Sequence, residues 1–154
     1  MRNLLMTPGP TPVPEQARLA MAKEMIHHRT KEFSGVVKEL SESLQYVFKT
    51  KNPVITLTSS GTGAMEAAVI NLFSKGDKVV VINVGNFGKR FVQLCKTYGL
   101  DALEIAYPWG EAAKVEDLQE ILGKNTDVKG VFLTQHETST GVINDVEAFG
   151  KAIK

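Results

Sequence analysis

The spacing of the apolar positions changes at Pro53. Before it, two helices are predicted, because Pro14 suits the first turn of a helix over residues 14–25 and apolar side chains recur at helical spacing over residues 31–49. In the second helix these side chains fall on one stripe, so we expect that stripe to be buried. The stripe consists of Phe33, Val36, Val37, Leu40, Leu44, Val47 and Phe48.

After Pro53, short apolar runs alternate with helical segments. Runs with almost no polar interruption are typical of buried parallel strands. The succession predicts an α/β protein with a mostly parallel sheet and right-handed crossovers. The expected strands are 54–58, 79–83, 102–106 and 130–134, and the expected helices are 62–74, 87–98, 115–122 and 145–154.

Residues 1–14 are predicted to form an extended arm. Proline fixes its own backbone and disfavours a helix before it, and four prolines stand close together here. They are Pro8, Pro10, Pro12 and Pro14. We therefore divide the chain into this arm and a domain over residues 15–154.

Composition narrows the class of partner. With 43% apolar and 23% charged residues, the chain resembles a soluble globular domain. A formal net charge of +1 gives no basic footprint for nucleic acid, and no apolar run has the length of a membrane span. Cys95 is the only cysteine, so no internal disulfide is possible, and we expect a cytoplasmic protein that keeps Cys95 in its core.

The turn at Ser60, Gly61, Thr62 and Gly63 is the most informative local feature. It joins an apolar run to a helix, and the first amides of a helix attract a phosphate. It is neither a Walker loop, because no Gly-Lys-Ser/Thr follows, nor a good dinucleotide loop, because Glu66 replaces the third glycine. The alternative is an ordinary turn that Ser60 or Thr62 caps.

Further unusual segments follow the other predicted strands or lie near the N-terminus. Together with residues 46–53, the ordered segments 7–14, 28–29, 60–63, 85–90 and 135–142 resemble the class V aminotransferases. The nearest branch is the alanine–glyoxylate and serine–glyoxylate (serine–pyruvate) group. The resemblance implies a three-layer α/β/α, fold-type I large domain, incomplete here, that binds pyridoxal 5′-phosphate. It also implies a homodimer that transfers an amino group from a small amino acid to a 2-oxo acid.

The resemblance gives residues of these segments a role. Ser60, Gly61, Thr62 and Gly63 are expected to bind the cofactor phosphate, Phe87 to stack on the pyridine ring, and Thr138 to lie near the phenolic oxygen. Gly9 and His28 are expected to border the substrate pocket. Read without the resemblance, Phe87 is a core residue, and Thr138, Ser139 and Thr140 form a hydrogen-bonded turn. His136 and Glu137 make a weak metal site, and we assign no metal.

The family's Schiff-base lysine, its cofactor-binding aspartate and a substrate-binding arginine are expected beyond Lys154. We therefore interpret the chain as the N-terminal part of a larger enzyme that is inactive by itself. Strand 54–58 should also lie apart from the other three strands, without neighbours. The alternatives are a lyase or desulfurase of the same class and a non-catalytic module that binds a phosphorylated ligand. A nucleotide-binding oxidoreductase is weaker, because of Glu66 and because Asn83 replaces the acid that would bind a ribose.

Overall fold

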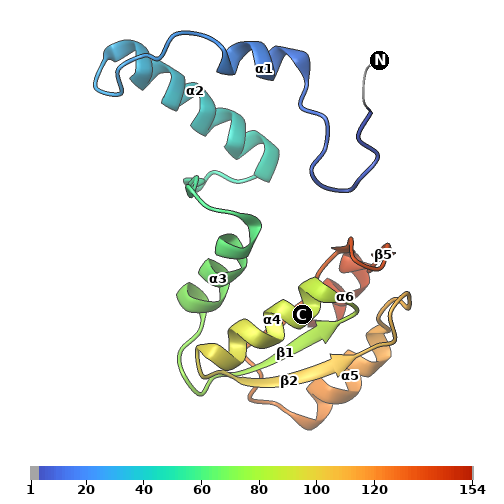
Figure 1. Cartoon of the computed structure of the whole chain (residues 1–154). Helices are drawn as coiled ribbons and strands as arrows, with labels where there is room; N and C mark the ends of the chain where they lie inside the picture. The colour runs from blue at the N-terminus through green and yellow to red at the C-terminus, as the bar shows by residue number, and fades with distance from the viewer. Residues whose placement is uncertain (1–3, 154) are drawn as a thin grey trace. The chain divides into compact units, whose positions relative to one another are not determined.

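The computed structural model describes residues 4–153, and the chain divides into two compact units, Met1–Leu57 and Thr58–Lys154 (Figure 1). The N-terminal unit contains helix α1 (Glu15–Met21) and helix α2 (Lys31–Phe48). The hydroxyl of Thr30 accepts a hydrogen bond from the Phe33 N–H at 3.2 Å and so starts α2. Both helices were predicted, but α1 ends earlier than residue 25. The division at residue 14 stays a prediction.

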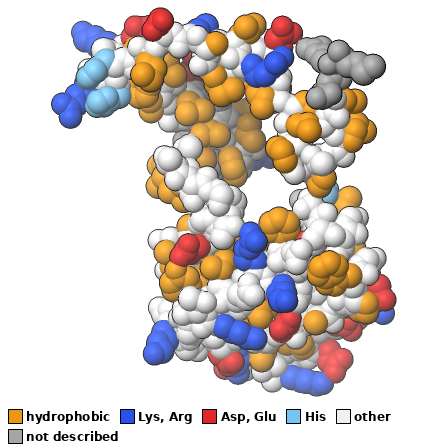
Figure 2. Space-filling view, viewed as in Figure 1, with side chains coloured by type: hydrophobic (Ala, Val, Ile, Leu, Met, Phe, Trp, Pro, Cys, Tyr) orange, Lys and Arg blue, Asp and Glu red, His pale blue; other side chains and the backbone are white. Residues whose placement is uncertain are grey.

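The apolar stripe of α2 was predicted to be buried, and this was wrong. Neither α1 nor α2 contains a buried residue, and apolar side chains lie at the surface of this unit (orange in Figure 2). The stripe forms because the helical period is local, whereas its burial needs a second surface to pack against. Phe33 and Leu44 are half-buried, and the exposed members are Val36, Val37, Leu40, Val47 and Phe48.

The N-terminal arm has neither helix nor strand over residues 4–14, as predicted. It is not fully extended, however. The hydroxyl of Thr7 donates a hydrogen bond to the Pro10 carbonyl at 2.7 Å, which closes a turn around Gly9. Met1 to Asn3, the start of the predicted arm, lie outside the described residues.

The C-terminal unit contains a parallel sheet of three strands in the order β2-β1-β3. Strand β1 lies in the centre, so its residues 79–82 are buried on both faces. Helices cover both faces, and a short antiparallel hairpin, β4-β5, follows β3. The bounds are α3 (Gly61–Leu72), β1 (Lys78–Asn83), α4 (Asn86–Thr97), β2 (Asp101–Ala106), α5 (Val115–Lys124), β3 (Gly130–Phe132), β4 (His136–Glu137), β5 (Val142–Ile143) and α6 (Val146–Ile153).

The alternation of side chains along β1 explains the three layers. Val79 and Val81 pack into a core with residues of α3 and α4. Val80 and Ile82 point to the opposite face and pack with Leu118 of α5 and Phe149 of α6, so the sheet lies between two helical layers. Cys95 lies fully buried in the first of these cores, as predicted.

The structure differs from the sequence predictions at three places in this unit or at its border. Residues 54–58 form no strand, because no described segment pairs with them and an isolated strand leaves its backbone hydrogen bonds unmade. The β4-β5 hairpin was missed, since strands of two residues are too short to show an alternating pattern. Strand β3 also ends at Phe132 rather than at residue 134.

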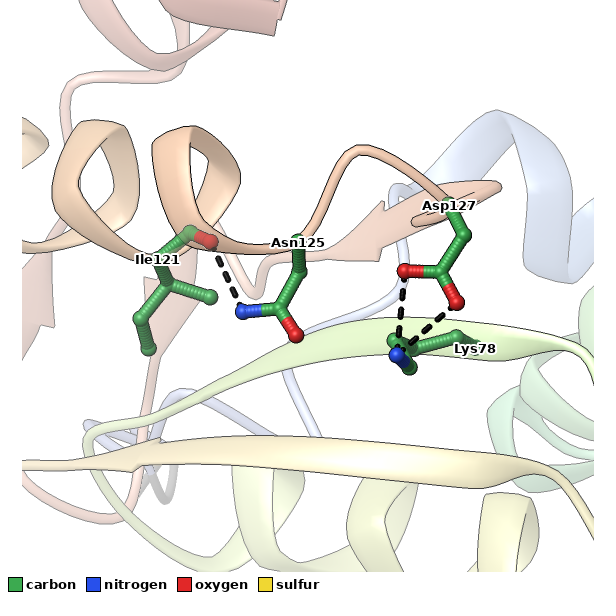
Figure 3. A network of polar contacts seen from close by, with 4 residues as sticks. All are labelled: Lys78, Ile121, Asn125 and Asp127. Carbon is green, nitrogen blue, oxygen red and sulfur yellow. Dashed lines mark hydrogen bonds and ion pairs between the residues drawn. The ribbon is translucent and has the colours of Figure 1, made fainter.

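Ion pairs fix the amino end of β1. The ammonium of Lys78 lies 2.8 Å from a carboxylate oxygen of Asp127, in the loop between α5 and β3 (Figure 3). Beside it, the Asn125 side chain donates to the Ile121 carbonyl at 2.9 Å and ends α5. Asp77 pairs with Lys129 at 2.6 Å. These contacts lie at the end of β1 opposite to the loops with unusual residues. Among the helices of residues 4–153, none combines the length and the apolar character that a membrane span needs.

Candidate functional site

The carboxyl ends of β1 and β3 bring two of the unusual loops together. Both strands run in the same direction, so the segment after Asn83 and the segment after Phe132 leave the sheet at the same edge. In open α/β sheets this edge is where ligands bind. Asn83 closes the first segment, because its side-chain oxygen accepts a hydrogen bond from the Gly85 N–H at 3.2 Å.

Glu137 joins these two loops. One oxygen of its fully buried carboxylate accepts hydrogen bonds from the backbone N–H groups of Phe87 and Gly88, each at 3.0 Å. The other oxygen accepts from the Ser139 hydroxyl at 2.5 Å, and Ser139 in turn accepts from the Asn86 N–H at 3.0 Å. A carboxylate at a helix N-terminus satisfies amides that lack a partner in the helix and interacts favourably with its dipole.

The glycines of this loop allow the close approach. A Cβ atom on Gly85 would lie 2.6 Å from Cγ of Glu137 and from the Ser139 hydroxyl oxygen. A Cβ atom on Gly88 would lie 2.7 Å from Cα of Asn83. Both glycines are therefore needed for α4 to begin against the end of β1 and against Glu137.

Phe87 and Thr138 line one cavity of about 260 Å³. Phe87 is half-buried, and its ring contributes to an apolar wall rather than to the core. Thr138, Ser139 and Thr140 lie in one turn, as the alternative predicted, because the Glu137 carbonyl accepts hydrogen bonds from the N–H groups of Thr140 and Gly141 at 3.1 and 2.9 Å. Thr138 lines the cavity as well. The other lining residues are Met65, Phe91, Thr134 and His136.

Thr134, which also lines the cavity, has an unpaired polar atom. Its hydroxyl oxygen is buried and has no hydrogen-bond partner among residues 4–153. A buried hydroxyl without a partner is unfavourable, so a ligand that hydrogen-bonds to it would stabilise the site. Thr134 could not be singled out from the sequence, because nothing in the apolar run before it indicates that it lines a cavity.

The N-terminus of α3 differs from that of α4. Ser60 stands at the N-cap, but its side chain makes no capping hydrogen bond. The Ser60 carbonyl accepts from the N–H groups of Gly63 and Ala64, at 3.0 and 3.4 Å. Gly61 and Thr62 come before the first residue that a helix can pair, so their N–H groups have no acceptor within it. The alternative of ordinary capping by Ser60 was thus wrong, and these amides can bind an anion.

Arg90 connects the start of α3 with the aromatic wall. Its guanidinium donates a hydrogen bond to the Thr62 hydroxyl at 2.7 Å, and its central carbon lies 5.5 Å from the centre of the Phe87 ring. Glu66, on the same helix as Thr62, accepts a hydrogen bond from the Tyr98 hydroxyl, which raises the pKa of Tyr98. Glu66 therefore ties α3 to the end of α4.

Two of the predicted site residues lie in the other unit. Gly9 is in the turn closed by Thr7, and the ring of His28 stacks on that of His27 with centroids 4.6 Å apart. Their role at a substrate pocket stays a prediction. No group of three or more His, Cys, Asp or Glu side chains within residues 4–153 could hold a metal ion.

The family model described as aminotransferase class-V matches residues 8–154. The chain belongs to the class V aminotransferases. The small subunit of a soluble hydrogenase from Synechococcus sp. is 44% identical over 99% of this chain and 40% of the relative. An aspartate aminotransferase from Thermus thermophilus superposes with a TM-score of 0.90 at 36% identity, over 99% of this chain and 42% of that structure. An alanine–glyoxylate aminotransferase from Nostoc sp. gives 0.86 at 34% identity, over 97% and 40%.

These comparisons confirm the predicted family and fold class. The fold is the α/β fold of the fold-type I aminotransferases, and the chain spans about 40% of the length of the curated relatives that it matches. Pyridoxal 5′-phosphate is the cofactor that this family implies. The residues present fit it: an aromatic wall at Phe87, an unpaired hydroxyl at Thr134, and open helix amides at Gly61 and Thr62.

Proposed function

We propose that this class V aminotransferase chain forms part of a pyridoxal-phosphate enzyme that transfers an amino group. The donor is a small amino acid of the alanine or serine type, and the acceptor is a 2-oxo acid such as glyoxylate or pyruvate. The observation that carries the proposal is the cavity that Phe87 and Thr138 line together, beside the helix whose first turn contains Thr62. The name of the Nostoc relative supports this donor and acceptor class.

In this proposal each loop holds one part of the cofactor. Ser60, Gly61, Thr62 and Gly63 bind the phosphate through the first amides of α3 and the Thr62 hydroxyl. Phe87 stacks on the ring, which adds about 0.5–1.5 kcal/mol beyond burial. Thr138 and Thr134 supply hydroxyls at the cavity wall.

Glu137 acts through Phe87 in the same proposal. It fixes the backbone from which the ring projects, so the ring stays at the cavity wall. When bound, pyridoxal phosphate supplies a ring that accepts the electron pair released at the amino-acid carbon. The residues described here bind and orient that ring.

The remaining parts of the enzyme are also proposals. We propose a lysine and an aspartate that take part in the family's reaction, a homodimer and a cytoplasmic location. We also propose that Gly9 and His28 border a substrate pocket. The names of relatives point to different donors, since the Thermus relative is an aspartate aminotransferase. The alternatives of a lyase or desulfurase and of a non-catalytic phosphate-binding module have no specific observation in their favour.

The test is amino-group transfer by the full-length protein supplied with pyridoxal phosphate. Alanine is paired with glyoxylate, serine and aspartate are each paired with glyoxylate and with pyruvate, and the amino-acid products are separated and quantified. Formation of glycine from glyoxylate with alanine or serine supports the proposal. Cofactor binding without conversion of any donor would rule out the transferase and favour the lyase or the binding module.

A further inference from the structure

We infer that Arg90 is a positioning residue that makes the site selective for the phosphorylated form of the cofactor. It would do so by fixing the hydroxyl of Thr62 at the start of α3 while its guanidinium lies near the ring of Phe87. The inference rests on the proposed function, because it names how that function's phosphate cup is held together.

Arg90 uses only part of the hydrogen-bonding capacity of the Thr62 hydroxyl. The Arg90 guanidinium donates at 2.7 Å and takes one lone pair of the Thr62 oxygen. A hydroxyl has one hydrogen to donate and two lone pairs to accept with. The Thr62 hydroxyl donates to no described residue of the C-terminal unit, so its hydrogen remains available for an acceptor other than Arg90. A phosphate oxygen is such an acceptor, and the neighbouring amides of the helix attract it.

Arg90 also brings a positive charge to this part of the site. Arg90 is half-buried and forms no ion pair with an Asp or Glu within the described residues. Arginine is positively charged, so this part of the site carries a positive charge that is not paired directly with a carboxylate. A phosphate group would neutralise it. An unphosphorylated ligand would not.

A single arginine also links the two parts of the site. The guanidinium carbon lies 5.5 Å from the centre of the Phe87 ring, within the range of a cation–π interaction. Thr62 comes from α3 and Phe87 from α4, and Arg90 contacts both. One side chain therefore keeps the phosphate-binding turn in register with the aromatic wall.

The experiment compares binding of pyridoxal 5′-phosphate with binding of unphosphorylated pyridoxal to the full-length protein by calorimetry. The variants are Arg90→Met, Arg90→Lys, Thr62→Val and the double variant Arg90→Met/Thr62→Val. Lys89→Met is the matched control, because it removes a positive charge from the next, exposed position of the same helix. Thermal melting of each cofactor-free variant accompanies the binding measurements.

Arg90→Met is expected to weaken pyridoxal phosphate binding about tenfold, as loss of a hydrogen bond to a charged group does, while pyridoxal binding changes less than about twofold. Thr62→Val should behave alike, and the double variant should lose little more than either single variant, because the two residues act together. Lys89→Met should leave unchanged the affinity ratio, which is the affinity for pyridoxal phosphate divided by that for pyridoxal. If Arg90→Met does not fold, Arg90→Lys decides: it keeps the charge but not the fork geometry, so the ratio should fall.

Three results would overturn the inference. They are equal weakening for both ligands, an unchanged ratio in the Arg90 variants, and a loss in Lys89→Met as large as in Arg90→Met. Failure of the proposed function gives a different result. If the native protein binds pyridoxal phosphate but transfers no amino group, the proposed reaction is wrong. The affinity ratio of the Arg90 variants then still tests the role of Arg90. If it binds neither ligand, both proposals fall.

Discussion

A carboxylate oxygen of Glu137 accepts a hydrogen bond from the backbone N–H of Phe87 at 3.0 Å, across 50 positions of sequence. This bond fixes the start of α4 to the loop after β3. Phe87 and Thr138 thereby come to line the same cavity, although they belong to different loops. The position of the aromatic ring thus depends on a buried residue that does not itself line the cavity.

Replacing Glu137 by alanine should destabilise the protein by about 2–4 kcal/mol, because two N–H groups at the start of α4 lose their acceptor. Chemical denaturation of the native and variant proteins measures the difference. Glu147→Ala is the control, since Glu147 forms an exposed pair with Lys151 and should contribute less than about 0.5 kcal/mol. Equal effects of the two substitutions would contradict the role of Glu137.

Replacing Gly85 by alanine should destabilise the protein by about 1–3 kcal/mol, because the new methyl group would overlap Glu137 and Ser139. Gly123→Ala in α5 is the matched control. A Cβ atom there meets nothing within 4 Å, and alanine favours a helix by up to about 1 kcal/mol over glycine. The two substitutions should therefore shift the denaturation midpoint in opposite directions. An unchanged or raised denaturation midpoint for Gly85→Ala would contradict this prediction, because it would mean that the loop can relax around Glu137.

The thiol of Cys95 should react slowly in the native protein. Burial raises its pKa from the ordinary 9.0 to about 11. The thiolate fraction at mildly alkaline pH then falls roughly a hundredfold, and the thiolate is the reactive form. Disulfide-exchange labelling with and without denaturant measures this. Equal rates in the two conditions would mean that Cys95 is not in the core.

Acid should weaken the contacts at the amino end of β1. The pKa values of Asp77 and Asp127 lie below the ordinary 3.8, because each carboxylate accepts a hydrogen bond from a lysine, Lys129 and Lys78 respectively. A lowered pKa in the folded state contributes stability above the unfolded pKa. That stability is lost as the pH falls through the folded pKa.

Asp127→Asn is therefore expected to be less stable than the native protein at neutral pH, and to approach it well below pH 3.8. Thermal melting across this range measures the difference. Lys38→Ala is the control, because Lys38 and Glu42 form an exposed pair at 4.0 Å that should contribute almost nothing. A difference for Asp127→Asn that does not change with pH would contradict this account.

The sequence predicted the elements whose signals are local. The uninterrupted run from Val79 to Ile82 predicted a buried parallel strand, and the period of residues 87–98 predicted α4 almost to its ends. The strand expected at residues 54–58 depends on a partner, and no described segment supplies one. The buried stripe of α2 fails for the same reason, because burial is a property of two surfaces and the pattern describes only one.

The candidate site was predicted in part. Phe87 and Thr138 came from the resemblance, and the structure brings both to one cavity. Glu137 was left without a role, since its contact with Phe87 depends on how two distant loops meet. Thr134 carries no signal of its own in the sequence, and Arg90 belongs to segment 85–90 but was given no role there. Each becomes informative only through an unpaired oxygen or a contact between two helices.

The most direct test of the account is an experimental structure of the full-length protein soaked with pyridoxal 5′-phosphate. The account predicts that the phosphate contacts the amides of Gly61 and Thr62, and that the ring lies against Phe87. A phosphate bound elsewhere, or a ring away from Phe87, would contradict the assignment of this cavity as the cofactor site.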